Sequence, residues 1–448
     1  MAAMERLIGL SLGADLDWPI YYEDILARLD PHVRIGGDDI TFRVERVTIE
    51  PFDLDQSVRY DVLLDRLTHW YHTSREWIKK AVVHDDLYVL NNPFTIQAME
   101  KHTSYAAMMR LGLPVPETAL LPPKEYEPQP DLQVTLSQYA RHFDLGEIGA
   151  RIGYPSYLKP YDGGAWRGVS RIENEEQLRN AYDQSGRSIM HLQQAIEPYD
   201  LFVRCLAVGP QVNVIRYDPT LPLHQRYQVD FNFVDSAEWS LLSDMTLTIN
   251  SFFNWDFNSC EALRKDGTFY PIDFANACPD SQVTSLHYHL PWLVKAKIRW
   301  SLYVAATRRR MRHHPDWIPF FLVADTDLPY REKLRAYAEI AHDRFETERF
   351  NDFCERFLGD LDEVAWDYFG TDRAREAVHR KVGALFPADE VEGFTDHFWG
   401  LVQFWRKTER DRLDAVGSTP MPGTSSPTEP LPVTVQVEGQ EEGLEGQL

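Results

Sequence analysis

The sequence has little cysteine, and its cysteines stand far apart. Cys205, Cys260, Cys278 and Cys354 contain no Cys-x-x-Cys pair, so neither a zinc site nor a disulfide framework is indicated, and a reducing compartment is favoured. No apolar run reaches the roughly 18 residues that a membrane-spanning helix needs. The N-terminal apolar run is too short, and too interrupted by glycine, for a signal peptide. We therefore expect a cytoplasmic protein.

The chain is also poor in positive charge. Its 46 Lys and Arg residues face 69 Asp and Glu residues, which gives a formal net charge of −23. A nucleic acid or an anionic membrane would be repelled overall, so we expect neither as the main partner, although a small cationic pocket stays compatible with this charge. With 448 residues, of which 44% are hydrophobic, the chain has the length for two or three packed units.

Two familiar phosphate-binding motifs are missing, since no Gly-Lys-Ser/Thr opens a helix and no G-x-G-x-x-G occurs. What the first 90 residues do contain is an alternation of strand and helix patterns. This alternation predicts a small α/β unit with a largely parallel sheet. The expected strands cover 5–12, 43–49, 62–65 and 87–90, and the expected helices cover 18–29 and 74–82.

The middle of the chain reads as mixed α and β. Helices are expected at 94–100, 104–111, 133–151 and 174–186, and strands at 118–121, 201–208 and 212–217. A further short strand is expected to end in Lys159, and β-like patterning covers 226–235 and 252–274. From 292 to 416 the pattern is helical. The tail, 417–448, has five prolines, five glutamates and no Lys or Arg, so it cannot bury enough surface to fold, and we expect disorder.

A first group of residues suits a polyphosphate. An apolar strand ends in Lys159, and a glycine-rich turn follows that would let backbone N–H groups approach phosphate oxygens while side chains supply positive charge. The alternatives are an ordinary hairpin turn and, for Lys101, a solvated lysine at a helix end. The candidate residues are Lys101, Lys159, Gly163, Gly164, Arg167 and Gly168.

A second group lies just before the strand that carries Arg204. The extended backbone of Gln194, Ala195 and Ile196 would pair with an adenine edge, and Glu197 or Asp200 would accept from ribose hydroxyls. The alternative interpretation of this stretch is an acidic turn.

A third group suits a magnesium ion. Glu261 and Asp273 flank the turn 264–267, so two paired strands would set both carboxylates at the same level of the sheet. Without a cation they would repel each other, whereas Mg²⁺ takes such hard oxygen ligands together with phosphates. Asn276 would add a neutral oxygen, and Asp280 is a weaker candidate. The alternative is a polar hairpin edge.

Two further features are given ordinary structural interpretations. His287 and His289 have strand spacing but no third ligand in an obvious place, so surface or core histidines are favoured over a metal site. The basic stretch 308–314 ends a long helix, where cations complement the helix dipole, so a solvated helix end is expected.

Taken in order, these groups resemble the ATP-grasp superfamily, in the branch of glutathione synthetases, D-alanine–D-alanine ligases and the ribosomal-protein glutamate ligase. The resemblance covers about residues 91–290. It implies α/β and α+β architecture, with an N-terminal domain (1–90) before an ATP-grasp domain (91–291) whose lobes cover about 91–192 and 193–291. The helical extension (292–416) and the tail (417–448) have no counterpart in the resemblance.

The resemblance also implies roles. Lys101, Lys159 and the glycine loop would contact the phosphates of ATP, residues 194–200 would hold adenine and ribose, and Glu261, Asp273 and Asn276 would bind Mg²⁺ or Mn²⁺. Arg204, together with Lys159, would neutralise the transferring phosphoryl group. In this sequence Asp273 and Asn276 are three apart, so Asn276 needs a bulge or a strand end to face the metal. Trp166 makes the glycine loop bulkier than usual in the family.

The function implied is an ATP- and Mg-dependent carboxylate–amine or carboxylate–thiol ligase that acts through an acyl phosphate and releases ADP and phosphate. Its partners would be ATP and a small molecule or peptide, and the protein would be a monomer or a homodimer. The alternatives are a small-molecule kinase and a non-catalytic nucleotide-binding protein. The substrate itself has no motif in the sequence.

Overall fold

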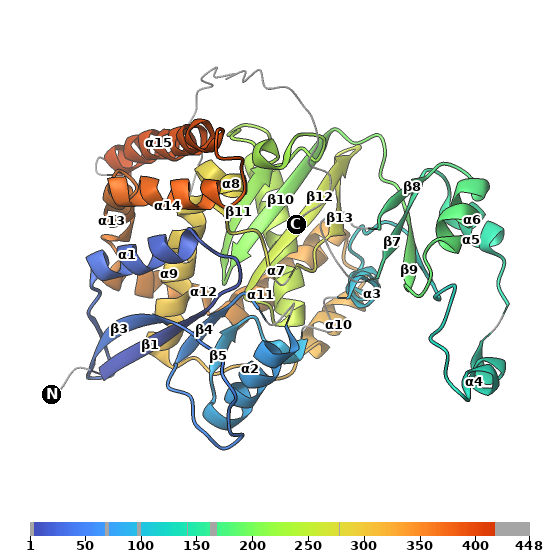
Figure 1. Ribbon diagram of the computed structural model, residues 1–448, viewed down its shortest axis with the longest axis horizontal. Helices are drawn as coiled ribbons and strands as arrows, with labels where there is room; N and C mark the ends of the chain where they lie inside the picture. Colours follow the sequence, from blue (N-terminus) through green and yellow to red (C-terminus); the bar gives the residue numbers. More distant parts are fainter. Residues whose placement is uncertain are drawn as a thin grey trace.

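The computed structural model describes residues 4–67, 71–95, 100–140, 142–161, 168–276 and 278–416. Within these residues, the chain forms three β-sheets, with helices packed around and between them (Figure 1). The predicted tail at 417–448 lies outside the described residues. Among the residues that are described, no helix has both the length and the apolarity to cross a membrane.

The N-terminal unit is the predicted α/β unit. Its sheet has the order β2-β3-β1-β4-β5, and β3, β1, β4 and β5 run parallel, while β2 pairs antiparallel with β3 at one edge. The largely parallel sheet is thus confirmed, and β2 is an added strand. The elements are β1 (Met4–Ser11), α1 (Trp18–Leu29), β2 (Val33–Ile35), β3 (Asp38–Arg46), β4 (Val62–Asp65), α2 (His72–Asp85) and β5 (Tyr88–Leu90).

A second sheet, here the first-lobe sheet, projects to one side of the molecule (Figure 1). It is antiparallel, has the order β6-β9-β7-β8, and buries one face against α5 and α6 in a small core of its own. The helix α3 lies between this sheet and the rest of the protein. The elements are α3 (Lys101–Leu111), β6 (Thr118–Leu121), α4 (Leu132–Tyr139), α5 (Leu145–Ile152), β7 (Ser156–Pro160), β8 (Ser170–Ile172), α6 (Glu175–Asp183) and β9 (Met190–Gln194).

The third sheet, here the second-lobe sheet, is antiparallel in the order β11-β10-β12-β13. Alternate residues of its strands face two different cores. Val203 and Cys205 pack toward α7, whereas Phe202 and Leu206 pack toward α9 and the N-terminal unit. The elements are β10 (Leu201–Val208), β11 (Gln211–Arg216), η2 (Leu223–Gln225), α7 (Ser236–Phe253), β12 (Phe257–Lys265) and β13 (Thr268–Asp273).

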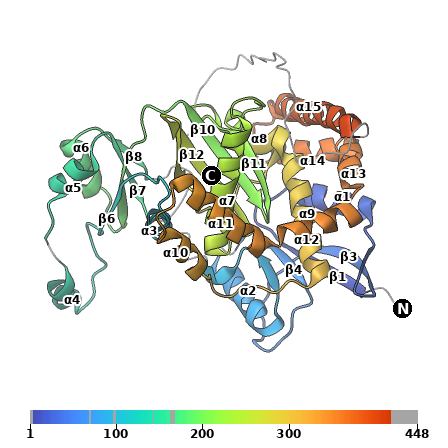
Figure 2. The same cartoon turned by 180° about the vertical axis from the view of Figure 1, so that it is seen from behind.

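The helices after the second-lobe sheet are part of the main body. Seen from behind, α9 runs between the N-terminal unit and the second-lobe sheet, and α11 lies over α7 (Figure 2). Of the residues of α9, those from Leu290 to Ala306 are almost all buried. The elements are α8 (Val283–Leu286), η3 (His287–His289), α9 (Leu290–Thr307), α10 (Ile318–Ala324), α11 (Tyr330–Phe345), α12 (Thr347–Phe357), α13 (Leu361–Tyr368), α14 (Asp372–Gly383) and α15 (Val391–Val416).

Three sequence-based expectations are wrong, and one helix was not expected. The single helix expected over 133–151 is two helices, since α4 ends at Tyr139 and α5 begins at Leu145. The β-like patterning at 226–235 is irregular chain that makes only an isolated bridge between Tyr217 and Tyr227. Residues 236–253 form α7, which was not expected. Part of the expected helix 94–100 falls outside the described residues, and Lys101 is the first residue of α3 rather than a break between two helices.

Candidate active site

The predicted phosphate and metal residues meet where α3, the first-lobe sheet and the second-lobe sheet touch. Lys101 on α3 forms an ion pair with Asp273 on β13, with 3.0 Å between Nζ and Oδ2. Tyr105, one turn further along α3, donates a hydrogen bond to the backbone carbonyl of Ile272. Lys159 on β7 reaches the same carbonyl at 3.3 Å. Residues predicted from three distant parts of the sequence therefore share one junction.

Lys159 is a buried cation with neutral hydrogen-bond partners. Its ammonium group donates to Tyr105 Oη at 2.7 Å and to Gln193 Oε1 at 2.8 Å, besides the Ile272 carbonyl. Burial, with added repulsion from Lys101, lowers the pKa of Lys159 to about 7, although Asp273 acts in the opposite direction. A lysine held in this way gains from an anionic ligand, because the ligand would offset the cost of desolvating its charge.

Glu261 and Asp273 stand opposite each other on paired strands, as predicted. Glu261 on β12 is in register with Asp273 on β13, and the two-residue turn Asp266–Gly267 joins the strands with positive φ at both positions. This is the turn geometry that Asp-Gly favours in hairpins. The register shifts between Glu261 and Ala262, so Ile272 is the extra residue of a β-bulge just before Asp273.

Each of these carboxylates is paired with a cation. Although Asp273 keeps 38% of its side chain exposed, desolvation by its surroundings opposes ionisation. Lys101 and Lys159 outweigh that effect and hold the pKa of Asp273 below its ordinary value. Arg204 on β10 lies in register with Glu261 and forms an ion pair with it. The two carboxylates that would repel each other are thus balanced by residues predicted to bind phosphates.

Arg204 sits in an aromatic cage. Its guanidinium carbon lies 4.4 Å from the ring centroid of Tyr217 and 5.2 Å from that of Tyr227, and it donates to the Tyr227 hydroxyl. Burial alone would lower the pKa of Arg204, but Tyr227, Tyr217 and Asp280 raise it above its ordinary value. The cage fixes a permanent positive charge next to Glu261.

The donor set at this junction fits a hard divalent cation that is only partly held by protein. Glu261 and Asp273 supply carboxylate oxygens from neighbouring strands, and Mg²⁺ characteristically takes one or two protein carboxylates and completes its shell with water and phosphates. Within the described ranges, no group of three or more His, Cys, Asp or Glu side chains is placed to hold a metal. Such an ion would therefore depend on its phosphate ligand.

Asn276 lies three residues beyond Asp273, where β13 ends. The β-bulge lies earlier, at Ile272, and so does not involve Asn276. Its side-chain amide donates to Ser259 Oγ at 3.1 Å, and its side-chain oxygen accepts from the backbone N–H of Cys278 at 3.3 Å. Ser259 lies two residues before Glu261 on β12, so Asn276 is adjacent to the carboxylate pair. Its metal-binding role stays a prediction.

The predicted adenine segment links the two lobes, and part of its backbone is already in use. The amide of Gln194 donates to the Glu117 carbonyl at 2.9 Å, and that of Ala195 donates to the Pro155 carbonyl at 3.1 Å. Ile196 is buried and packs with the core of the second lobe. An N–H donor to an adenine edge would thus come from Ile196 or a later residue of this segment.

The two predicted ribose acceptors are both held by arginines. Glu197 accepts hydrogen bonds from Arg171 and, at 2.9 Å, from the hydroxyl of Tyr157. Asp200 forms an ion pair with Arg264. Because the side chain of Asp200 is 62% exposed and that of Glu197 is 27% exposed, Glu197 is the more firmly positioned of the two.

The glycine loop falls mostly outside the described residues. Gly163, Gly164, Trp166 and Arg167 are among those not described, so their predicted contacts with phosphates stay predictions. Gly168 is described, with φ of +70°, and a Cβ built on it would lie 3.0 Å from the ring of Pro160. The loop therefore returns to the end of β7 at a position that favours glycine.

Several residues at the junction were missed in the sequence. Tyr105, which holds Lys159, and the aromatic cage of Tyr217 and Tyr227 belong to none of the motifs. Gln193 directly precedes the predicted adenine segment, but its hydrogen bond to Lys159 was not predicted. For Tyr105 and the cage, only the packing of separate elements brings the side chains together.

The two features given ordinary interpretations behave differently. His287 and His289 are buried, as the core-histidine interpretation expected. The basic stretch is mostly exposed, but Arg309 is an exception: its side chain is only 8% exposed and pairs with Glu346 at 2.6 Å. The solvated interpretation is therefore wrong for Arg309, which packs against the C-terminal end of α11 instead.

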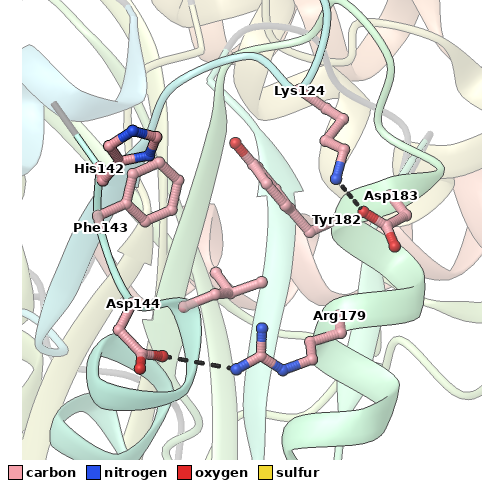
Figure 3. A pocket seen from close by; sticks show the side chains of 8 residues that line it. Lys124, His142, Phe143, Asp144, Arg179, Tyr182 and Asp183 are labelled. Atoms are coloured by element: carbon pink, nitrogen blue, oxygen red, sulfur yellow. Dashed lines mark hydrogen bonds and ion pairs between the residues drawn. The ribbon is translucent and has the colours of Figure 1, made fainter. Parts of the chain in front are cut away.

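A surface pocket of about 650 Å³ lies in the first lobe, away from this junction (Figure 3). Its wall carries two ion pairs, Lys124 with Asp183 and Arg179 with Asp144, which already satisfy its charges. None of the predicted site residues lines it. The lining residues are Lys124, His142, Phe143, Asp144, Leu145, Arg179, Tyr182 and Asp183.

No protein-family model matches this chain, and no curated protein matches it. Solved structures do match. A D-alanine–D-alanine ligase from Bacillus anthracis, complexed with ATP, has a TM-score of 0.44 at 14% identity and covers 69% of this chain and 100% of its own. A RimK-domain ATP-grasp protein from Sphaerobacter thermophilus DSM 20745 has a TM-score of 0.41 at 14% identity, over 61% of this chain and 92% of its own.

The VanG D-Ala:D-Ser ligase from Enterococcus faecalis has a TM-score of 0.41 at 11% identity, over 76% of this chain and 100% of its own. Similarities of this size leave the function of the chain to be argued from its own residues.

Proposed function

We propose that this protein is an ATP- and Mg-dependent ligase of the ATP-grasp type, which joins a carboxylate to an amine or a thiol through an acyl phosphate. The nucleotide would lie between a first lobe at about 91–192 and a second lobe at 193–291. The N-terminal unit and the helices after residue 291 would frame the substrate. The sequence resemblance supports this proposal, and so does the geometry of the junction.

One observation carries the proposal. Glu261 and Asp273 lie in register on neighbouring strands, and each is paired with a cation, Arg204 or Lys101. A Mg–ATP complex brings both a cation for the carboxylates and phosphates for the basic side chains. Both ion pairs would therefore exchange partners on binding, and no charge at the junction would be left unbalanced.

The chain's residues have defined tasks in the proposed reaction. Lys101 and Lys159 hold the phosphate chain, and Arg204 faces the γ-phosphate. A substrate carboxylate oxygen attacks the γ-phosphorus while the bond to the β-phosphate oxygen breaks, which gives an acyl phosphate and ADP. An amine nitrogen then attacks the acyl carbon, loses its proton and expels inorganic phosphate. Catalysis is mainly positioning and charge neutralisation.

When bound, Mg²⁺ would supply positive charge that neutralises the phosphates. Glu261 and Asp273 would hold it, with Asn276 as a neutral third ligand. The closeness of Lys101 to Asp273 means that this lysine would turn toward the phosphates as the carboxylate turns toward the metal.

The proposal is tested by a screen of amino acids, short peptides and small thiols for ATP-dependent release of ADP. We expect ADP and phosphate when a carboxylate and an amine or thiol are both present, and hydroxylamine should trap an acyl hydroxamate from the carboxylate alone. Release of AMP and pyrophosphate would contradict the acyl-phosphate route. ADP release with a hydroxyl acceptor and no trapped hydroxamate would identify a kinase instead.

Asp273→Asn supplies the matched test of the site. We expect at least a hundredfold loss of ADP release, because the variant removes a full negative charge from the metal position. The control is Asp266→Asn, in the turn of the same hairpin, where the left-handed conformation suits asparagine equally well. If both variants keep wild-type turnover, this junction is not the active site.

A further inference from the structure

His191 on β9 is a buried histidine without a hydrogen-bond partner among the residues that the structure describes. Its side chain is completely buried, and within the described residues neither Nδ1 nor Nε2 makes a hydrogen bond. Buried polar groups are nearly always paired, and leaving one unpaired lowers the stability of the fold. The packing of the ligand-free protein does not explain why a histidine without hydrogen bonds is buried here.

The position of His191 points to the phosphate junction. His191 is directly opposite Lys159 in the register of β9 and β7, so both side chains lie on the same face of the first-lobe sheet. Gln193, which accepts from Lys159, shares this face two residues further on. The opposite face of the sheet packs against α5 and α6, so the face with His191 is the one turned toward α3.

A second histidine on α3 faces the same place. The ring centroid of His102 lies 6.0 Å from that of His191, and the Nδ1 of His102 is also buried without a partner. Tyr105 on α3 also lies against His191, with 6.0 Å between the two ring centroids. His191 with two unpaired ring nitrogens and His102 with one therefore stand beside Lys101 and Lys159. The Nε2 of His102 lies 3.6 Å from a carboxylate oxygen of Glu100, whereas no described carboxylate bonds to His191.

The charge state of His191 agrees with a role as a neutral donor. Burial, reinforced by Lys159, His102 and Lys101, lowers the pKa of His191 to about 3. A neutral imidazole offers one N–H donor and one acceptor. Next to two lysines, a neutral donor adds a hydrogen bond without adding a further repelling charge.

We propose that His191 and His102 are binding residues for a phosphate group held between Lys101 and Lys159, and that their unpaired ring nitrogens hydrogen-bond that group or its attached nucleoside. The inference rests on the proposed function and makes it more specific, because it adds two residues to the nucleotide site. A purely structural histidine is disfavoured here, since an apolar side chain of similar size would fill the space without unpaired nitrogens.

The experiment compares two variants of the full chain, His191→Leu and His191→Asn, by calorimetric ATP binding in Mg²⁺ and by thermal unfolding without ligand. Loss of a hydrogen bond to a charged group predicts about tenfold weaker binding or more in H191L. Its ligand-free melting temperature should be equal to or above that of the wild type. H191N keeps a donor and should bind within about threefold of the wild type.

Equal ATP affinity of H191L and the wild type would overturn the inference while leaving the proposed function intact. A wild type that fails to bind ATP would instead remove the proposed function, and the inference with it. If H191L does not fold, the ring ¹⁵N NMR signals of the wild type test the inference instead. The signal of His191 is the one that is missing from the spectrum of H191N. A shift of the His191 signal on adding ATP supports the inference, and an unchanged signal contradicts it.

The same measurement applies to His102, which has a partly exposed ring. His102→Asn should weaken ATP binding less than H191L does, because water can replace a hydrogen bond at a partly exposed site. An effect of His102→Asn as large as that of H191L would overturn the ranking of the two residues.

Discussion

The two four-stranded sheets hold their charges in different ways. In the second-lobe sheet, Arg204 is paired with Glu261, and Asp273 is paired with Lys101 from α3. In the first-lobe sheet, Lys159 has only neutral partners, and His191 has none among the described residues. The second lobe is therefore electrostatically complete without ligand, whereas the first lobe keeps groups that an anion would satisfy.

The sheets also differ in how they are packed. The first-lobe sheet covers one face with α5 and α6 and has a core of its own. The second-lobe sheet is buried on both faces, by α7 on one side and by α9 with the N-terminal unit on the other. We expect substitutions in the second lobe to change stability more than substitutions in the first lobe, because a sheet buried on both faces has less room to relax.

The largest effect is expected for Arg204→Met. This variant leaves Glu261, whose side chain is 13% exposed, as a nearly buried carboxylate without its cation, and such a change costs about 3–5 kcal/mol. Urea unfolding of the ligand-free protein measures this loss of unfolding free energy. The double variant R204M/E261M removes both charges and should recover most of the loss. A loss below about 1 kcal/mol in R204M would contradict the paired-charge description.

A second comparison uses two glycines with positive φ. A Cβ at Gly209, between β10 and β11, would lie 2.4 Å from the ring of Trp300, while a Cβ at Gly186 in the first lobe meets nothing within 4 Å. Gly209→Ala should therefore cost roughly 1–3 kcal/mol more than Gly186→Ala, because backbone strain is common to both and overpacking is not. Equal melting temperatures for the two variants would contradict this expected difference in stability.

A smaller effect is expected for Lys159→Met. Because Lys159 has no carboxylate bonded to it, its removal should cost less than about 2 kcal/mol at pH 7. Its folded pKa of about 7 lies below the unfolded value of about 10.4, so the unfolded state binds more protons between these values. Wild-type stability should thus rise relative to K159M as pH increases from 7 to 10. Parallel pH profiles would show that Lys159 keeps an ordinary pKa.

The sequence predicts some elements of this fold closely and fails at others for a physical reason. The strand β10, at 201–208, and the helix α1, at 18–29, have the predicted bounds because apolar runs and turn residues mark their ends. The helix α7 was missed because it is buried on nearly all sides from Leu242 to Phe253, so it lacks the polar stripe of an amphipathic helix. Its capping box at Asp235 and Glu238 was the usable signal.

The candidate site, like the fold, was predictable from the sequence only in part. The Asp-Gly turn pairs Lys265 with Thr268, and this register alone would place Glu261 opposite Ile272. The β-bulge at Ile272, which the turn does not predict, brings Asp273 opposite Glu261 instead. Which cation faces which carboxylate was not predictable, because Lys101, Lys159 and Arg204 lie on three separate elements whose packing depends on the whole core. His191 has no motif, and only its burial distinguishes it.

The position of α9 bears on which parts of the protein can move relative to one another. This helix contacts β1 and β4 of the N-terminal unit and β10 of the second lobe, and its nearly continuous burial ties these parts into one rigid frame. The first lobe is joined to that frame through α3 and the segment 195–200. Because the first lobe lies outside this frame, we expect a rigid-body motion of the protein to move the first lobe relative to the N-terminal unit and the second lobe.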